Sequence, residues 1–468
     1  MGVRLWLLLA ACAMLLAACA HESAPPQALV LPEPSSQGPS AVVVVSVAGL
    51  TPDLYRAANS PMPTLAALAE GGASADAVHS VAPASSYPAH ATLSTGRRPA
   101  GHGVVANHRL GERGVGHERY SGAAELRAPT LWRQAALSGL RVATLGWPST
   151  VGAKVASNLP DVEPTRSGES WLDALRHHTD ARMIALADAA GARAPEVALP
   201  GAARDRLLID VACRLMEDPR PPQLLFVHLA QSSAALRSCG AGAREARAAF
   251  ARVDQELARL VTCTHAQGRL ADTTIVAVGD HGVMSVHTRV SPNAALAEAG
   301  LLTPIRNGQG MVQWDAVTRS NGGSAFVYAR KGEDAVLARR ALERKAEQTG
   351  AFRVVTAQEM KSLGADPDAW FGLEAEPGFV FSNDARGPFL RAAATRGVGG
   401  YLPGHREMDA GFVAWGPGIA RGLRIPVMEL TDVAPTLAPL LGLSLDGVEG
   451  RVLVGVLRLP RVSAMPER

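Results

Sequence analysis

The stretch AVVVVSVAGLTPDLY, residues 41–55, carries the first fold signal of the sequence. Five of its first seven residues are valine, and the run breaks at Gly49 before Thr-Pro-Asp. A short, continuously apolar run rich in β-branched residues predicts a strand buried on both faces, and the break after it predicts a helix start. The carboxyl ends of strands carry the chemistry in open α/β sheets, yet this strand ends in Ala48, which can neither bind nor catalyse.

The same strand-then-helix pattern continues along most of the chain. Further strands are expected near Arg141–Gly146, Gln223–Leu229, Thr273–Gly279 and Gly411–Trp415. Helical patterns fit Thr64–Glu70, Pro129–Ser138, Asp205–Glu217, Ala243–His265 and Thr431–Leu441. This alternation predicts an α/β fold in which a mostly parallel sheet is sandwiched by helices.

The pattern changes between about Arg289 and Arg396. Strand-like runs cover Ser324–Arg330 and Phe352–Val355, and a charged helix is expected over Glu333–Gln348. We therefore expect a smaller α+β cap at residues 289–396, inserted into a core formed by residues 41–288 and 397–455.

Length and charge limit the classes of protein. A chain of 468 residues suits one large domain with an insertion, or two domains. The net charge of +3 comes from arginines that are scattered and interleaved with acids. Such charges are typical of solvated surfaces, so nucleic-acid binding is not expected.

The N-terminus has the pattern of an exported lipoprotein. Arg4 precedes an apolar run over residues 5–18, which is too short to span a bilayer and typical of a signal peptide. The sequence LAAC at residues 16–19 resembles the lipobox of bacterial lipoproteins. On that resemblance residues 1–19 form the signal segment, and Cys19 is acylated and anchors the chain to a membrane. A plain secretory signal is the alternative.

The segment that follows indicates how the domain is held. Residues 20–40 are rich in Pro, Ser, Ala and Gln, which predicts a flexible tether. Ala20 lacks the Asp that retains lipoproteins at the inner membrane, so we expect an outer-membrane protein that faces the periplasm. Cys213, Cys239 and Cys263 also remain; one pair could form a disulfide in an oxidising periplasm, and the sequence leaves open which.

Four motifs recur in an order that is known from one family. They are SYPAHATLSTG (86–96), TTIVAVGDHGVM (273–284), GYLPGHREMDAGFVAWGPGI (400–419) and DVAPTLAPLLGL (432–443). Together they resemble the type I phosphodiesterase/nucleotide pyrophosphatase family of the alkaline phosphatase superfamily. The resemblance runs from about Val42 to about Val452.

The resemblance implies a metal-dependent site. Members of that family hold two zinc ions with three Asp and three His, and a Thr or Ser acts as nucleophile. The metals clamp the attacking and leaving oxygens of an in-line displacement at phosphorus. In this chain Ser86 occupies the nucleophile position, and Asp280 and His281 occupy one Asp-His ligand pair.

The other four ligand positions are substituted. The first Asp maps to Ala48, and the Asp and His that follow the strand LLFVHL map to Gln231 and Ala235. The last His maps to Gly399; His405, six residues later, is a weak alternative.

The alignment after LLFVHL can be shifted by two residues. Ser233 and Arg237 then take the places of Gln231 and Ala235, and the ligands are still absent. Two of the six metal ligands remain in either case, so we expect no zinc or one weakly bound zinc.

Three functional hypotheses remain open. The first is a catalytically degenerate family member with a relic phosphate-binding pocket that takes an anionic or phosphorylated small ligand. The second is an active phosphoester hydrolase that uses Ser86 with one metal or with relocated ligands, drawn from His79, His102, His287 and His405. The third is a metal-free hydrolase that uses Ser86 with His281 as base and Asp280 to orient it. Adjacent side chains after a strand tend to diverge, and no Gly-x-Ser-x-Gly motif is present.

Overall fold

The computed structural model describes residues 31–164, 169–192, 201–305 and 311–458. The chain divides into the units Met1–Leu31 and Pro32–Arg468, and the fold described here is that of the second unit. Cys19, the signal segment and the first part of the predicted tether lie outside the described residues.

The centre of the fold is an eight-stranded sheet, counted over the described residues. Its order is β21 (Leu423–Ile425), β2 (Ala73–Ala75), β20 (Phe412–Trp415), β9 (Thr273–Gly279), β1 (Ala41–Val47), β8 (Leu224–Leu229), β6 (Val142–Leu145) and β7 (Ser157–Leu159). Only β20 runs antiparallel to its neighbours. The predicted mostly parallel α/β sheet is therefore confirmed.

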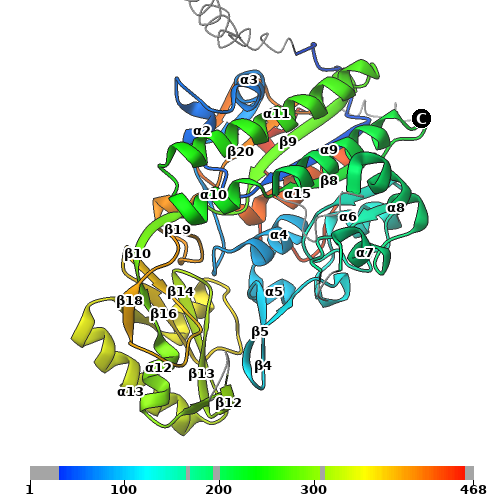
Figure 1. The fold of residues 1–468 in the computed structure, drawn as a ribbon. Helices are drawn as coiled ribbons and strands as arrows, with labels where there is room; N and C mark the ends of the chain where they lie inside the picture. The colour runs from blue at the N-terminus through cyan, green and yellow to red at the C-terminus, as the bar shows by residue number, and fades with distance from the viewer. Residues whose placement is uncertain (1–30, 165–168, 193–200, 306–310, 459–468) are drawn as a thin grey trace, which may run out of the picture. The chain divides into compact units, whose positions relative to one another are not determined.

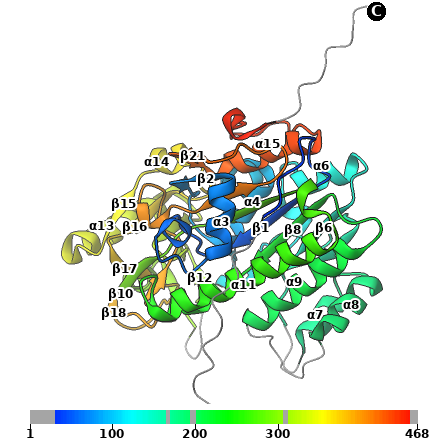
Figure 2. The same cartoon turned by 90° about the horizontal axis from the view of Figure 1, so that it is seen from above.

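The valine run of β1 is buried because helices cover both faces of the sheet. Val42 and Val44 pack into a cluster with residues of α4 (Ser86–Thr95), α6 (Leu131–Leu137) and α15 (Val433–Leu437). Alternate residues of a strand point to opposite faces. The opposite face is covered by α3 (Pro63–Gly71), α9 (Gly201–Glu217) and α11 (Arg244–Ala266) (Figures 1 and 2).

The register of the parallel strands brings three strand ends to one edge. Val47 at the end of β1 lies beside Leu229 of β8 and Gly279 of β9. The residues that follow these strands therefore emerge together, and they include Ala48 and Asp280.

A second, smaller sheet forms the region predicted as a cap. Its order is β13 (Ala316–Ser320), β14 (Ser324–Ala329), β16 (Phe371–Ala375) and β15 (Phe352–Val355), all antiparallel. Helix α13 (Gly332–Thr349) packs against it, and β10 (Met284–Val290) pairs with β17 (Gly378–Phe381) and β18 (Leu390–Ala392). The predicted elements at 324–330, 333–348 and 352–355 agree with β14, α13 and β15 within one residue at each end.

One local feature was not predicted, and another differs from its prediction. The hairpin of β4 (His108–Gly111) and β5 (Gly114–Arg119) reaches the cap, where the Met311 N–H donates to the Arg113 carbonyl at 3.3 Å. The helix expected over residues 431–441 is broken into a 3₁₀ turn, α15 and a second 3₁₀ turn. Pro435 and Pro439 lack the backbone N–H that a continuous α-helix requires.

The end of the predicted tether contacts the core. The backbone N–H groups of Ser35 and Ser40 donate to the carbonyls of Ala271 and Asp272, each at 2.8 Å. Within the described part of the chain, no helix is both long enough and apolar enough to cross a membrane.

Candidate functional site

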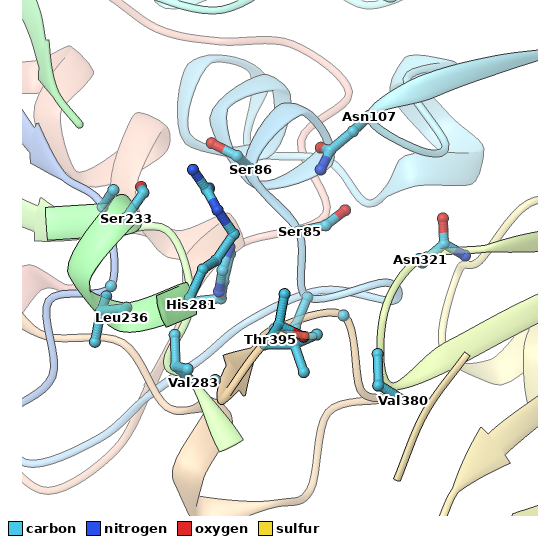
Figure 3. Close-up of a pocket in the computed structure, with 18 of the residues that line it drawn as sticks. Ser85, Ser86, Asn107, Ser233, Leu236, His281, Val283, Asn321, Val380 and Thr395 are labelled. Carbon is cyan, nitrogen blue, oxygen red and sulfur yellow. The ribbon is translucent and has the colours of Figure 1, made fainter. Parts of the chain in front are cut away.

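A cavity of about 410 Å³ opens at the edge where the three strands end. From the core it is lined by Ala48, Ser86, Asp280, His281 and Gly399, among others, and from the cap by residues that include Asn321 and Val380. Figure 3 shows Ser86 and Asn107 on one side of this cavity and Asn321 and Val380 across from His281. The structure thus brings Ser86, the retained Asp-His pair and two substituted ligand positions into one cavity.

Ser86 is the first residue of α4, and Ser85 is its N-cap. Neither side chain caps the helix, and the Ser85 Oγ is buried without a hydrogen-bond partner among the described residues. The Tyr87 N–H donates to Asn107 Oδ1 at 2.9 Å, so the Asn107 amide nitrogen keeps its two N–H donors. These groups give the cavity hydrogen-bond donors at a helix N-terminus, where anions bind favourably.

Asp280 is almost fully buried at the end of β9. Its Oδ1 accepts the backbone N–H of Gly49 at 3.0 Å and that of His281 at 2.9 Å. Burial alone would raise the pKa of this carboxyl, but the nearby imidazoles, His281 first, and the Gly49 N–H hold that pKa at about 2. The carboxylate is therefore ionised, and its Oδ2 has no hydrogen-bond partner within the described structure.

His281 is oriented by a backbone carbonyl. Its Nδ1 lies 2.7 Å from the Gly282 carbonyl oxygen, which can only accept, so Nδ1 donates its N–H and Nε2 is the ring atom left for another partner. That Nε2 lies 3.6 Å from Asp280 Oδ2. A carbonyl that accepts the second ring N–H is also the usual arrangement for a metal-binding histidine.

The position of the last family ligand is blocked. A Cβ atom placed on Gly399 would lie 2.5 Å from Cε1 and Nδ1 of His281 and 3.0 Å from the Ala84 carbonyl oxygen. The imidazole of His281 therefore occupies the space in which a side chain at residue 399 would begin.

Gln231 and Ala235, the remaining two substituted positions, line an adjoining cavity of about 630 Å³. The two cavities share Ser86, Asn107, Ser233 and Arg237. Ser233 and Arg237, which arise from the shifted alignment, thus face both cavities, whereas Gln231 and Ala235 line only the second.

The residues present do not fit two zinc ions. One carboxylate oxygen, one imidazole nitrogen and the Ser86 hydroxyl are the donors around the retained pair. Across the described ranges, no group of three or more His, Cys, Asp or Glu side chains is arranged to hold a metal. Catalytic zinc normally has three protein ligands, and two zinc ions carry four positive charges against the single carboxylate of Asp280.

None of the four relocated-ligand candidates lines either cavity. His405 instead pairs through Nε2 with Glu374 Oε1 at 2.9 Å, and His79 pairs through Nδ1 with Glu429 at 3.1 Å. His102 is buried against Thr92, and His287 is hydrogen-bonded to Thr288. Each of the four histidines is engaged elsewhere, so the structure does not place any of them as a ligand at either cavity.

Two other histidines, which motif reasoning missed, lie behind Ser86. The rings of His90 and His228 are 4.3 Å apart, and burial, which is the main cause, lowers the pKa of both, that of His90 to about 3. His90 Nδ1 lies 2.7 Å from the Ser86 carbonyl oxygen but 3.4 Å from Ser86 Oγ. Its Nδ1 proton is therefore committed to the carbonyl, and His90 is not placed to act as a base for Ser86.

The metal-free hydrolase also lacks its proton path. No hydrogen bond joins Ser86 to His281 in the described structure, so His281 Nε2 is not placed to take the Ser86 proton, and Asp280 does not orient the ring because the Gly282 carbonyl holds Nδ1. The geometry therefore provides a polar, donor-rich cavity without an activated nucleophile.

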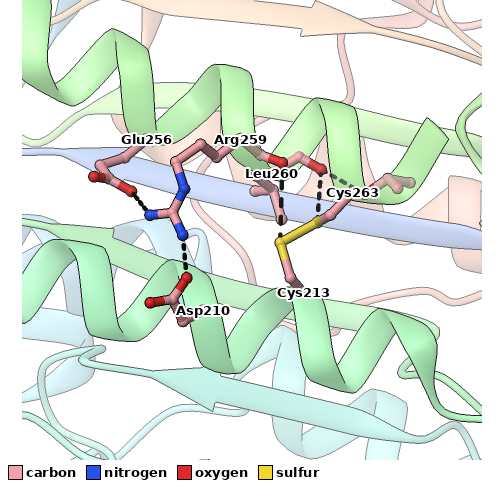
Figure 4. Close-up of a disulfide and its surroundings, with 7 residues drawn as sticks. Asp210, Cys213, Glu256, Arg259, Leu260 and Cys263 are labelled. Carbon is pink, nitrogen blue, oxygen red and sulfur yellow. Dashed lines mark hydrogen bonds and ion pairs between the residues drawn. A yellow bond between two sulfur atoms is a disulfide. The ribbon is translucent and has the colours of Figure 1, made fainter. Parts of the chain in front are cut away.

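A disulfide encloses a segment that lines both cavities. Cys213 on α9 is bonded to Cys263 on α11, and Cys239 is an exposed free thiol (Figure 4). This decides the pairing that the sequence left open. The enclosed segment contains α10 (Ser232–Cys239), which carries Ser233 and Arg237.

The comparisons with known proteins agree with the motifs. The model of the family described as type I phosphodiesterase/nucleotide pyrophosphatase matches residues 42–401. This match confirms the resemblance that the motifs indicated. No curated protein sequence matches the chain.

Solved structures show the same fold at low sequence identity. Murine ectonucleotide pyrophosphatase/phosphodiesterase 5, as an inactive variant in complex with AMP, is 18% identical with a TM-score of 0.67. The match covers 90% of this chain and 100% of that one. The human counterpart is 15% identical with the same TM-score, over 89% and 100% of the two chains.

Proposed function

Because the chain belongs to the type I phosphodiesterase/nucleotide pyrophosphatase family, we propose that it is a catalytically degenerate member that binds a phosphate-bearing ligand in the cavity at Ser86. The observation that carries this proposal is the donor set of that cavity. Two of six family ligand positions keep ligating side chains, and His281 fills the space at Gly399.

The ligand's phosphate group lies at the start of α4. The hydroxyls of Ser85 and Ser86 and the amide of Asn107 supply donors to its oxygens, and Asn321 Nδ2 of the cap is a further buried donor without a described partner. Asp280 Oδ2 accepts but cannot donate, so a protonated phosphate oxygen or a water supplies a hydrogen there. The apolar cap residues on the opposite wall then cover the rest of the ligand.

Metal content and turnover test this function directly. The full-length protein, purified in detergent and dialysed, should hold well under one zinc per chain by elemental analysis. It should not cleave bis(4-nitrophenyl) phosphate, yet it should bind phenyl phosphate by calorimetry. Two tightly bound zinc ions with turnover would overturn the proposal.

Asn107 provides a matched variant for the binding measurement. Asn107→Asp keeps the oxygen that accepts the Tyr87 N–H but replaces the amide donor by a negative oxygen. We expect this variant to fold and to lose phenyl phosphate binding. Unchanged binding would place the phosphate elsewhere.

A hydrolase with one metal is the second candidate, favoured by the buried, unpartnered Oδ2 of Asp280 and by the carbonyl that orients His281. These two residues and Ser86 would hold the ion, which would supply a Lewis acid at phosphorus. About one zinc per chain, with turnover that is lost in Ser86→Ala, would favour this candidate.

For the location, we propose a lipid anchor on Cys19 and an outer-membrane protein that faces the periplasm. The lipobox-like sequence before Cys19 supports the anchor, and the Cys213–Cys263 disulfide is in keeping with an oxidising compartment. Replacing Cys19 by Ser should move the protein from the membrane fraction to the soluble periplasm. Unchanged fractionation would refute the anchor.

A further inference from the structure

Two arginines at the second cavity have no partner for their charge among the residues that the structure describes. Arg237 on α10 and Arg252 on α11 both line this cavity and are exposed. Neither guanidinium forms an ion pair or a hydrogen bond with another described residue. Two unpaired guanidinium groups at one cavity repel each other unless an anion lies between or beside them.

The other charges of this cavity are already balanced. Arg204 bonds Asp161 at 2.7 Å and Glu163 at 3.2 Å, and Arg119 lies 3.7 and 3.6 Å from the same two carboxylates. The two positive and two negative charges of these four residues cancel. Arg237 and Arg252 therefore leave an excess of about two positive charges at the cavity.

The other titratable groups on the walls of the cavity offset only part of that excess. Asp205 is buried beneath the start of α10, where it accepts the backbone N–H groups of Ala230 and Gln231. Burial raises the pKa of Asp205 to about 7, so its charge is partial near neutral pH. Burial lowers the pKa of His228, which disfavours its charged form.

Buried polar atoms provide a second, independent observation. Gln231 and His228 each have 8% of their surface exposed and line the cavity. The Oε1 of Gln231 and the Nε2 of His228 have no hydrogen-bond partner in the part of the chain that the structure describes. The Gln231 oxygen can only accept, so the cavity wall has an unused acceptor for a hydroxyl or amine group of a ligand.

We propose that Arg237 and Arg252 form a second anion subsite, so that the ligand carries two anionic groups. This rests on the proposed function, in which the first group, a phosphate, lies at Ser86. Arg237 lines both cavities and connects the two subsites, where its positive charge replaces part of the charge that the absent metals would supply. The planar guanidinium presents paired N–H donors to phosphate or carboxylate oxygens.

Two ligands that differ in one group test the subsite. The full-length protein is titrated by calorimetry, with a chelator present, against propyl phosphate and against 1,3-propanediol bisphosphate. We expect the bisphosphate to bind about ten-fold more tightly, since its second phosphate gains charge-assisted hydrogen bonds to the two guanidinium groups. Arg252→Gln should abolish this preference and leave propyl phosphate binding unchanged.

A control variant on the same helix tests whether the position of the lost charge matters, and not only the loss of one positive charge. Arg244→Gln removes the same charge from an exposed residue of α11 that lines neither cavity, and it should keep the preference. The second subsite would be overturned if the parent protein bound both ligands with equal affinity, or if Arg252→Gln kept the preference for the bisphosphate. In either case, binding of propyl phosphate would still support the first subsite. Binding of neither ligand would overturn both proposals.

Discussion

At the scale of residues, Ala48 is the substitution whose surroundings are best suited to reversal. It lies at the end of β1 and lines the same cavity as Asp280 and His281, and the neighbouring Gly49 N–H donates to Asp280. Ala48→Asp would add a second carboxylate to the retained pair, which gives the three protein ligands that zinc sites need. We expect zinc content to rise from well under one to about one per chain by elemental analysis after dialysis.

The matched comparison for this prediction is Ala235→His. It restores a family residue that lines only the second cavity, where no retained ligand accompanies it. Its zinc content should stay at that of the parent protein. Two results would contradict the assignment of residue 48 to the cavity of Asp280 and His281 and of residue 235 to the second cavity: an equal gain of zinc in both variants, or no gain of zinc in Ala48→Asp.

Much of the site could be predicted from the sequence because its motifs are local. Ser86, Asp280 and His281 lie inside short recognisable segments, and the register of three strands places them together. The roles of Arg237, Asn107 and His228 could not be predicted, because each depends on contacts between elements far apart in the chain. For example, whether Arg237 has a charge partner among the described residues depends on the side chains of all the elements around it and not on the residues of its own segment.

At the scale of elements, the long apolar and periodic runs were predictable and the short pieces were not. β1 is a run of valines buried on both faces, so its residues alone predict a strand. Short strands such as β2 and β21 carry three residues each, which is too few for a period to be visible. They form because they pair with strands that lie far away in the sequence, as β2 does with β20 and β21, and such pairing cannot be seen in their own residues.

The packing of α5 (Pro99–His102) on α4 predicts a dependence of stability on pH. His102 is fully buried, with Nε2 3.0 Å from Thr92 Oγ1 and Nδ1 accepting the Val104 N–H at 3.1 Å. Burial lowers the pKa of His102 to about 3, whereas an unfolded histidine has a pKa of about 6.5. The unfolded state therefore binds one more proton between these values, and stability is lost as pH falls through this window.

The variant His102→Asn removes this titration. The free energy of unfolding of the parent should fall more steeply with decreasing pH than that of the variant, by about 1.4 kcal/mol per pH unit between about pH 4 and 6. Urea unfolding at several pH values measures it. Thr92→Val, which removes the hydroxyl but keeps the imidazole, should retain the parent slope; equal slopes in parent and His102→Asn would contradict the argument.

The disulfide between α9 and α11 predicts a measurable contribution to stability. It closes a sequence separation of 50 residues, so it restricts the unfolded chain. The double variant Cys213→Ser, Cys263→Ser should lose about 2–4 kcal/mol of the free energy of unfolding in urea. Cys239→Ser, at the exposed thiol, should unfold like the parent; a similar loss there would point to a role for the free thiol.

At the scale of the whole second unit, core and cap share one apolar cluster. Ala82 and Ala84, which precede α4, pack in the same cluster as Phe326 and Leu373 of the cap sheet. Tyr401 is fully buried in this cluster, and its hydroxyl donates to the Phe379 carbonyl. Removing the cap from the core would therefore expose apolar surface on both sides.

This shared cluster predicts that core and cap unfold in one transition, although proteins of this size often show several. Gly323 tests it, because a Cβ atom there would lie 2.0 Å from the Tyr401 ring, which would have to move. We expect Gly323→Ala to lower the midpoint of a single calorimetric transition, with a loss of about 1–3 kcal/mol or more. Gly332→Ala, at the start of α13, meets Trp370 only at an ordinary 3.5 Å and should change little. The cap would fold independently if the parent showed two separate transitions, or if Gly323→Ala shifted only one of two transitions. The cavity between core and cap would then be a junction that can open without unfolding the core.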